Sequence, residues 1–236
     1  YKSIFTPGGS AARVISLDDN SSTCTMNYSE ILPGQTSSHH IHPWEHEIYI
    51  IDCSGTLFCD GKEYPVREGD AIFIPENVDH YTLNNGRQDV IRRVEINPVA
   101  AAQSGAARSN GGTGTGQPPT IRNCRDLDSE TSTPILDDKD GVPNYLMICN
   151  GAMLPGQVTH PDTGGHSHRW DHVVFTLEGQ ATLVCEGKTF AVSEGDAVLV
   201  PPNVLHQWRN ETQQPMKRVT FNPLASEHHS VRNVAT

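Results

Sequence analysis

The sequence predicts an all-β protein in which one barrel-like or sandwich-like domain occurs twice along a chain of 236 residues. Short segments such as EIYII and HVVFTL have the period-two alternation of half-buried strands. Turn residues separate these segments, and no window has the periodicity of a long amphipathic helix. Regular short strands with turn signals favour a β-sandwich or a β-barrel, and the length suits two domains of roughly 115 residues each.

The two halves of the chain align with each other, which indicates a duplicated domain. Two long segments match without a gap, and the second copy carries four extra residues between its LPGQ sequence and its first patterned histidine. The aligned pairs are 40–62 with 166–188, 67–85 with 193–211, 31–35 with 153–157, and 93–98 with 218–223.

A Gly-rich segment, AAAQSGAARSNGGTGTGQPPT at 100–120, lies between the copies. It is small and polar, without a periodic apolar face, which is typical of a flexible linker. We therefore expect an N-terminal domain at 1–99, a linker at 100–120 and a C-terminal domain at 121–236.

Composition excludes two classes of partner. The net charge of −11 argues against nucleic acid, which is bound by clustered Lys and Arg. No apolar run approaches the roughly 18 residues that a membrane span needs. We expect a small-molecule ligand, with no nucleic acid and no membrane as a partner.

The six cysteines form no C-x-x-C pair and no dense framework. Cys59, Cys149 and Cys185 lie in apolar, strand-like runs and are predicted to be buried, unreactive thiols. Reduced thiols favour a cytoplasmic location. Because the chain begins at Tyr1 and not at Met, we expect it to be a trimmed form.

Each copy carries the pattern H-x-H-x-x-x-H, followed 34 residues later by one more histidine. Residues two apart on a strand point to the same face, so each H-x-H pair can direct two imidazoles into a barrel. The later histidine would begin a neighbouring strand and reach across to them. A single H-x-H is usually an ordinary polar stretch, but the same set written twice predicts a metal site in each copy. The predicted ligands are His40, His42, His46 and His80 in the first copy, and His166, His168, His172 and His206 in the second.

These motifs resemble those of the cupin superfamily, and the duplication resembles a bicupin, in which two cupin barrels are fused. The first cupin motif is matched by Gly34, His40, His42 and Glu47, with Cys53 in place of its final Gly. The second motif is matched by Gly69, Pro75, Asn77, His80 and Asn84, and again by Gly195, Pro201, Asn203, His206 and Asn210. The matches cover about 50 residues of each copy, and Asn replaces the middle Gly of the second motif, which is a mild change. The resemblance implies two tandem double-stranded β-helix (jelly-roll) barrels, and pairing into a homodimer.

The fourth ligand has two candidates in the first copy. The general cupin motif would use Glu47, whose counterpart Val173 cannot bind a metal. His46 and His172 occur in both copies and match a cupin variant with four histidines. We favour His46, with Glu47 supporting a ligand imidazole. If Glu47 were the ligand, the first site would contain three histidines and one carboxylate, and the two sites would differ.

Four neutral imidazoles suit a divalent first-row transition metal (Mn, Fe, Co, Ni, Cu or Zn), one per barrel, and disfavour Mg and Ca. The resemblance to bicupins implies a metal-dependent enzyme, and we favour a dioxygenase that acts on a small enolic or phenolic substrate chelated to the metal. The alternatives are a non-oxidative isomerase, lyase, cyclase or amidohydrolase, and a binding protein without catalysis.

Other residues near the motifs have open roles. Trp44 and Trp170 recur inside the ligand segments and either pack at the barrel mouth or line a substrate pocket. His160 is either a proton shuttle or an exposed loop residue. Arg93 and Arg218 align between the copies and could be solvated charges on an outer face.

Overall fold

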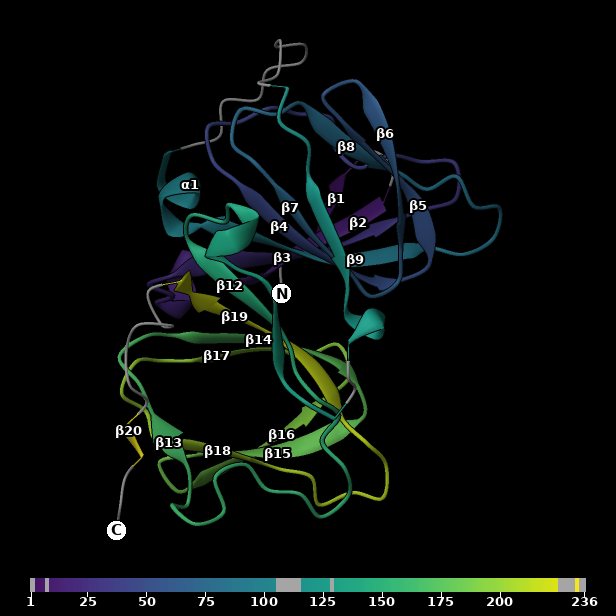
Figure 1. The fold of residues 1–236 in the computed structure, drawn as a ribbon. Helices are drawn as coiled ribbons and strands as arrows, with labels where there is room; N and C mark the ends of the chain where they lie inside the picture. Colours follow the sequence, from purple (N-terminus) through teal and green to yellow (C-terminus); the bar gives the residue numbers. More distant parts are fainter. Residues whose placement is uncertain (1–2, 7–8, 105–115, 128–129, 225–231, 234–236) are drawn as a thin grey trace. The chain divides into compact units, whose positions relative to one another are not determined.

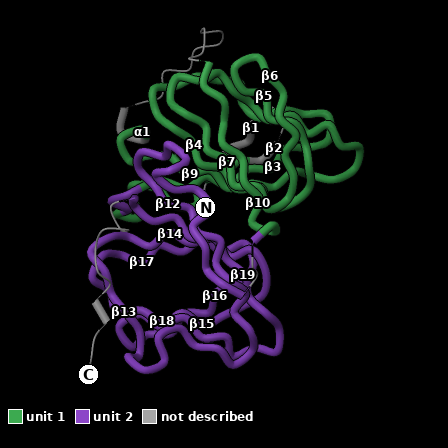
Figure 2. Tube along the Cα trace, viewed as in Figure 1, with its two compact units in different colours: residues 1–20, 24–126 green, residues 21–23, 127–236 purple. Residues whose placement is uncertain are grey.

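The computed structural model describes residues 3–6, 9–104, 116–127, 130–224 and 232–233, and its contacts form two compact units (Figure 2). Unit 1 contains Tyr1–Asn20 and Cys24–Asp126, and unit 2 contains Ser21–Thr23 and Leu127–Thr236. Each unit is an all-β jelly-roll barrel built from two sheets (Figure 1). This confirms the predicted fold class of two tandem barrels. No helix of the described residues has the length and apolar character needed to cross a bilayer.

Unit 1 is formed by a seven-stranded sheet, in the order β1-β2-β3-β9-β4-β7-β10, and a three-stranded sheet, in the order β6-β5-β8. Neighbouring strands pair antiparallel, in hairpins such as β1–β2 and β5–β6 and across longer connections such as β4–β7. The strands are β1 (Ser3–Thr6), β2 (Gly9–Ile15), β3 (Cys24–Ile31), β4 (His46–Asp52), β5 (Ser54–Cys59), β6 (Lys62–Arg67), β7 (Asp70–Ile74), β8 (His80–Leu83), β9 (Ile91–Pro98) and β10 (Thr120–Asn123). The helical segments are η1 (Leu17–Asp19), α1 (Val99–Ser104) and η2 (Cys124–Asp126).

Unit 2 has two five-stranded sheets, in the orders β11-β12-β19-β14-β17 and β16-β15-β18-β13-β20. Its strands are β11 (Thr133–Leu136), β12 (Tyr145–Cys149), β13 (His166–Ser167), β14 (His172–Glu178), β15 (Gln180–Cys185), β16 (Lys188–Ser193), β17 (Ala197–Val200), β18 (His206–Arg209), β19 (Lys217–Pro223) and β20 (Arg232–Asn233), and η3 is Asp138–Asp140. The hairpins between β5 and β6 and between β15 and β16 turn at Asp60-Gly61 and Glu186-Gly187. All four of these turn residues have positive φ.

Alternation along the strands gives each barrel an apolar interior. In unit 1 the core cluster includes Ile48, Ile50, Ile72 and Ile74, which lie on one face of β4 and β7. In unit 2 the corresponding cluster includes Val174 on β14 and Trp208 on β18. These faces also carry the first residues of β4, β8, β14 and β18, and all four are histidines. The core therefore fixes which way these histidines point.

The contact units differ from the sequence-based boundaries at residues 121–126. Strand β10 pairs with β7, with Thr120 opposite Phe73, and the buried Asn123 side chain donates to Asp70 Oδ1 at 2.6 Å. These contacts group the strand with unit 1, although it follows the Gly-rich segment. The segment 100–120 itself begins in helix α1, and its residues 105–115 lie outside the described part of the chain.

Of the three cysteines predicted to be unreactive thiols, Cys59 and Cys185 are free thiols in the structure. Cys59 is fully buried and Cys185 is half-buried, and burial raises the pKa of Cys59 to about 12. Cys149 is disulfide-bonded, so the expectation of a reduced thiol was wrong there. An apolar run predicts burial of a cysteine but says nothing of a second sulfur brought beside it.

Asp171 anchors a distant segment of the chain to the second barrel. It is fully buried and lies directly before His172. Its Oδ2 accepts the backbone N–H groups of Ser22 at 2.6 Å and Thr23 at 3.2 Å, and the Ser22 hydroxyl at 3.0 Å. This carboxylate therefore attaches Ser21–Thr23 to unit 2.

We expect Asp171→Ala to lower the free energy of unfolding by about 2–4 kcal/mol, because it removes the charged acceptor of three partly buried hydrogen bonds from Ser22 and Thr23. Urea unfolding followed by tryptophan fluorescence would measure the loss. The matched control is Asp162→Ala, at an exposed position of the same unit, which should stay within about 0.5 kcal/mol of the parent protein. Equal stability of the two variants would contradict the anchoring role.

Candidate metal centres

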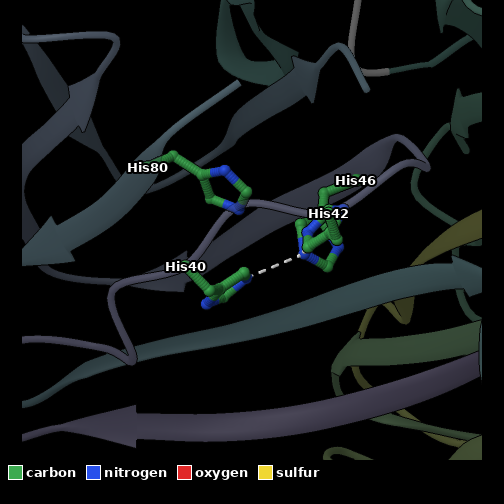
Figure 3. Close-up of side chains that lie close together, drawn as sticks. All are labelled: His40, His42, His46 and His80. Atoms are coloured by element: carbon green, nitrogen blue, oxygen red, sulfur yellow. Dashed lines mark hydrogen bonds between the residues drawn. The ribbon is translucent and has the colours of Figure 1, made fainter. Parts of the chain in front are cut away.

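The first histidine group forms where two strands of unit 1 begin. His46 opens β4, His80 opens β8, and His40 exchanges backbone hydrogen bonds with His80 at 3.2 and 3.1 Å. His42 follows His40 at the two-residue spacing that the sequence predicted to share a face. Figure 3 shows the four imidazoles turned toward one another. One ring nitrogen from each lies within 4.8 Å of the others, and His42 Nε2 is 2.6 Å from His46 Nε2.

The second group repeats this arrangement in unit 2. His172 opens β14, His206 opens β18, and His166 on β13 pairs directly with His206. Together with His168, they again place four ring nitrogens within 4.8 Å of one another. All eight predicted histidines are therefore brought together, four in each barrel.

Backbone carbonyls hold the outer nitrogens of four of these rings. His42 Nδ1 donates to Trp44 O at 2.7 Å, and His80 Nδ1 donates to Val78 O at 2.8 Å. The second barrel repeats both bonds, from His168 to Trp170 O at 2.6 Å and from His206 to Val204 O at 2.9 Å. A neutral imidazole that donates through Nδ1 must present a lone pair at Nε2. The backbone thus selects the tautomer whose Nε2 faces the group.

Burial keeps the rings neutral. It lowers the pKa of His42 to about 4 and that of His80 to about 3, with the neighbouring His40 as the next cause in both. In the second group burial lowers the pKa of His166 to about 3 and that of His168 to about 4. The pKa values of His46 and His172 lie well below the ordinary value for the same reason. Each group therefore offers unprotonated donors at neutral pH.

A tryptophan stacks on one histidine of each group. The Trp44 ring lies 4.4 Å from that of His42 with 8° between the planes, and Trp170 lies 4.6 Å from His168 at 10°. The same tryptophans supply the carbonyls that hold these histidines. This geometry supports the packing interpretation of Trp44 and Trp170, because their rings lie flat against the imidazoles.

Glu47 lies on the other face of β4 from His46, as alternation along a strand requires. It is fully buried, and neither carboxylate oxygen has a hydrogen-bond partner among the described residues. Burial, and then the charge of Glu45, raise the pKa of Glu47 well above its ordinary value. His46, and not Glu47, is the residue that the structure brings into the first group.

Strand β9 supplies charged residues that the sequence-based interpretation missed. Arg93 was considered a solvated outer charge, but it is only 5% exposed and lies opposite Ile50, on the interior face. Glu95 follows on the same face, with its Oε2 at 3.4 Å from Arg93 Nη2 and its Oε1 at 3.7 Å from His46 Nδ1. Alternation within RVEINP places residues 93, 95 and 97 on one face of the strand. This pattern was the feature of the sequence that could have grouped Glu95 with Arg93.

His160 lies beside the second group. Its ring centroid is 4.2 Å from that of His166, although the residue is exposed. The side chain of Gln207 donates to the carbonyl oxygens of Thr159 and His160 at 3.0 and 3.3 Å, which holds this loop against β18. The four residues inserted before His166 thus bring a fifth imidazole near the second group.

The residues present fit a bound transition metal. His80 Nε2, His168 Nε2 and His206 Nε2 are buried, and none has a hydrogen-bond partner among the described residues. Buried polar nitrogens without partners are costly unless something satisfies them. A divalent metal at the centre of each group would accept these lone pairs. The ring nitrogens of each group lie within 4.8 Å of one another, which is close enough for all four to bind one ion.

The two repeats match the family of cupin domains over residues 27–92 and 152–221, one match in each unit. The chain belongs to the cupin family. With two such domains, this cupin is a bicupin.

Known proteins similar to this bicupin support the fold. The polyketide synthase CurC of Streptomyces cyaneus is 26% identical over 80 residues, which are 34% of this chain and only 52% of CurC. A single-residue variant of Bacillus subtilis oxalate decarboxylase OxdC superposes with a TM-score of 0.74 at 14% identity, over 99% of this chain and 77% of that one. AerE from Microcystis aeruginosa gives a TM-score of 0.66 at 14% identity, over 94% and 96% of the two chains. At these identities the structural likeness establishes the architecture alone.

Proposed function

We propose that this bicupin is a metal-dependent enzyme that holds one divalent first-row transition metal in each barrel. The observation that carries the proposal is the convergence of four neutral imidazole nitrogens in each unit. Within the described residues neither group contains cysteine or a carboxylate, so the donor set suits Mn, Fe, Ni, Cu or Zn better than Mg or Ca. A closed structural zinc site would more often use cysteine. The solved structures of Bacillus subtilis oxalate decarboxylase include one described by its Mn(II) centres, which supports a transition metal as the expected occupant.

The reaction that we propose is a dioxygenation of a small enolic or phenolic substrate. A metal held by these imidazoles would supply Lewis acidity toward a chelating substrate oxygen and redox chemistry toward dioxygen. The protein's own part is to keep its imidazoles neutral, so that the enolate or phenolate supplies the negative charge. The backbone carbonyls and the two stacked tryptophans fix the direction of the rings. The isoleucine-rich core of unit 1 excludes water from beneath the first group.

Metal analysis and oxygen uptake on one sample test this proposal. The protein would be purified without added metal, analysed for metal content, and mixed with a panel of enols and catechol-type phenols in an oxygen electrode cell. We expect about two metal ions per chain and oxygen uptake with at least one substrate class. Metal-loaded protein that consumes no oxygen with any of them would overturn the dioxygenase assignment.

A non-oxidative reaction is the second candidate, and Arg218 favours it. Its guanidinium lies 5.1 Å from the centroid of Trp208 on the interior face of β19, and no acidic side chain of the described residues pairs with it. Burial lowers its pKa to about 10, so it remains charged at neutral pH. A half-buried cation on the interior face of a barrel, without an acidic partner among the described residues, suits a carboxylate substrate, whose cleavage or isomerisation needs no oxygen. Turnover of small carboxylic acids under anaerobic conditions would identify this case.

A further inference from the structure

The two histidine groups differ in the residues behind one ring of each. In the alignment of the two copies, RVEINP corresponds to RVTFNP, so that Glu95 corresponds to Thr220 and Asn97 corresponds to Asn222. Both segments are interior strands, β9 and β19, which run beside the strands that begin with His46 and His172. Because these strands are neighbours, the residues that differ between β9 and β19 lie near Nδ1 of His46 in the first barrel and of His172 in the second.

In the first barrel a carboxylate faces that nitrogen. His46 Nδ1 has no hydrogen-bond partner among the described residues, and it lies 3.7 Å from Glu95 Oε1. Asn97 and Asn27 donate to the same oxygen at 3.2 and 3.4 Å. Arg93 Nη2 lies 3.4 Å from the other oxygen, Glu95 Oε2. The amide donors and the guanidinium thus fix the Glu95 carboxylate behind His46.

In the second barrel a neutral amide takes that place. His172 Nδ1 donates to Asn222 Oδ1 at 2.6 Å. The Thr220 hydroxyl, at the position of Glu95, donates instead to Asn150 Oδ1 at 2.6 Å. The charges of the interiors differ accordingly, because Arg93 is compensated by Glu95 at 3.4 Å whereas Arg218 has no acidic partner among the described residues.

We propose that Glu95 makes the first group the tighter metal site, and that the two sites of this protein are inequivalent. The inference rests on the proposed metal binding and adds a positioning residue to it. A carboxylate beside the outer N–H of an imidazole favours the positive charge that the ring shares with a bound metal, and Glu95 Oε1 lies 3.7 Å from His46 Nδ1. A divalent cation is also better stabilised in a barrel where Glu95 compensates Arg93 than in one whose Arg218 has no acidic partner among the described residues.

Two full-length proteins with one intact group each separate the sites. His168→Ala/His172→Ala keeps only the first group, and His42→Ala/His46→Ala keeps only the second. Co(II) binding to each would be measured by its visible absorption in competition with a chelator. We expect Co(II) to bind the first group roughly 10–100-fold more tightly, which is the usual effect of a supporting residue behind a ligand.

Exchanging the carboxylate and the amide behind the two histidines then tests whether they cause the difference in Co(II) affinity. Glu95→Gln in the protein with only the first group should weaken Co(II) binding by about tenfold or more and shift its absorption bands. Asn222→Asp in the protein with only the second group should strengthen binding by a similar factor, because it places a carboxylate where an amide oxygen lies 2.6 Å from His172 Nδ1. Thr220→Val, which leaves Asn222 in place, is the matched control and should change the affinity little.

The outcomes distinguish this inference from the proposed function. If neither single-group protein bound Co(II), metal binding itself would be disproved. If both bound equally, and neither Glu95→Gln nor Asn222→Asp changed the affinity, the sites would be equivalent and the role of Glu95 would be wrong. Melting of the metal-free variants would reveal any that fail to fold, and Asn222→Asp decides the question if Glu95→Gln is among them.

Discussion

Replacement of His46 by alanine is expected to reduce the metal content from about two ions per chain to about one, because it removes one of four converging donors from the first group. The loss of affinity should exceed the roughly 10–100-fold typical of removing a supporting residue, since a ligand itself is lost. Metal analysis after dialysis against a weak chelator would measure the stoichiometry. His172→Ala should have the same effect on the second group.

Glu47→Gln is the matched control for His46→Ala, because it changes the adjacent residue of the same strand. Its side chain lies on the opposite face of β4, so the metal content should stay at about two ions per chain. The amide has nearly the shape of the protonated carboxyl. If Glu47→Gln lost one metal and His46→Ala kept both, the ligand would be the carboxylate of the general cupin motif, and the four-histidine assignment would be wrong.

The eight histidines were predictable because they depend on local rules. Spacing of two on a strand fixes a shared face, and the duplication excludes coincidence. The choice of His46 over Glu47 also followed from the sequence, since Val173 in the second copy cannot be a ligand. These features need no knowledge of which strand lies beside which.

The supporting residues were not predictable in the same way, because they depend on pairing between distant strands. Glu95 reaches His46 only because β9 pairs with β4, with Glu95 opposite Ile48. The alternation in β9 was also misleading. Polar residues at 93, 95 and 97 suggest a solvated face, yet the apolar Val94 and Ile96 are themselves fully buried on the other face. When both faces of a strand are covered, alternation identifies the faces but does not say which one is inside the barrel.

Glu47 should make the stability of the metal-free protein depend on pH in the opposite sense to an ordinary carboxylate. Burial raises its pKa in the folded state, whereas the unfolded chain has the ordinary value near 4.5. Between these two pKa values the folded state keeps the proton and the unfolded state releases it. Stability contributed by this group is therefore complete below the unfolded pKa and is lost, by about 1.4 kcal/mol for each pH unit, as the pH rises toward the folded pKa.

Glu47→Gln removes this titration and should flatten that part of the profile. We expect variant and parent to have similar stability at pH 5 and the variant to be the more stable of the two at pH 8, measured by urea unfolding of metal-free protein. Glu47→Val, which copies Val173, should show the same gain without leaving an unpaired amide, whereas Glu63→Gln at an exposed position should follow the parent. Parallel profiles for parent and Glu47→Gln would mean that Glu47 is ionised in the folded protein. Its burial without partners would then cost far more than the fold is expected to tolerate, so a neutral Glu47 is the state that the structure requires.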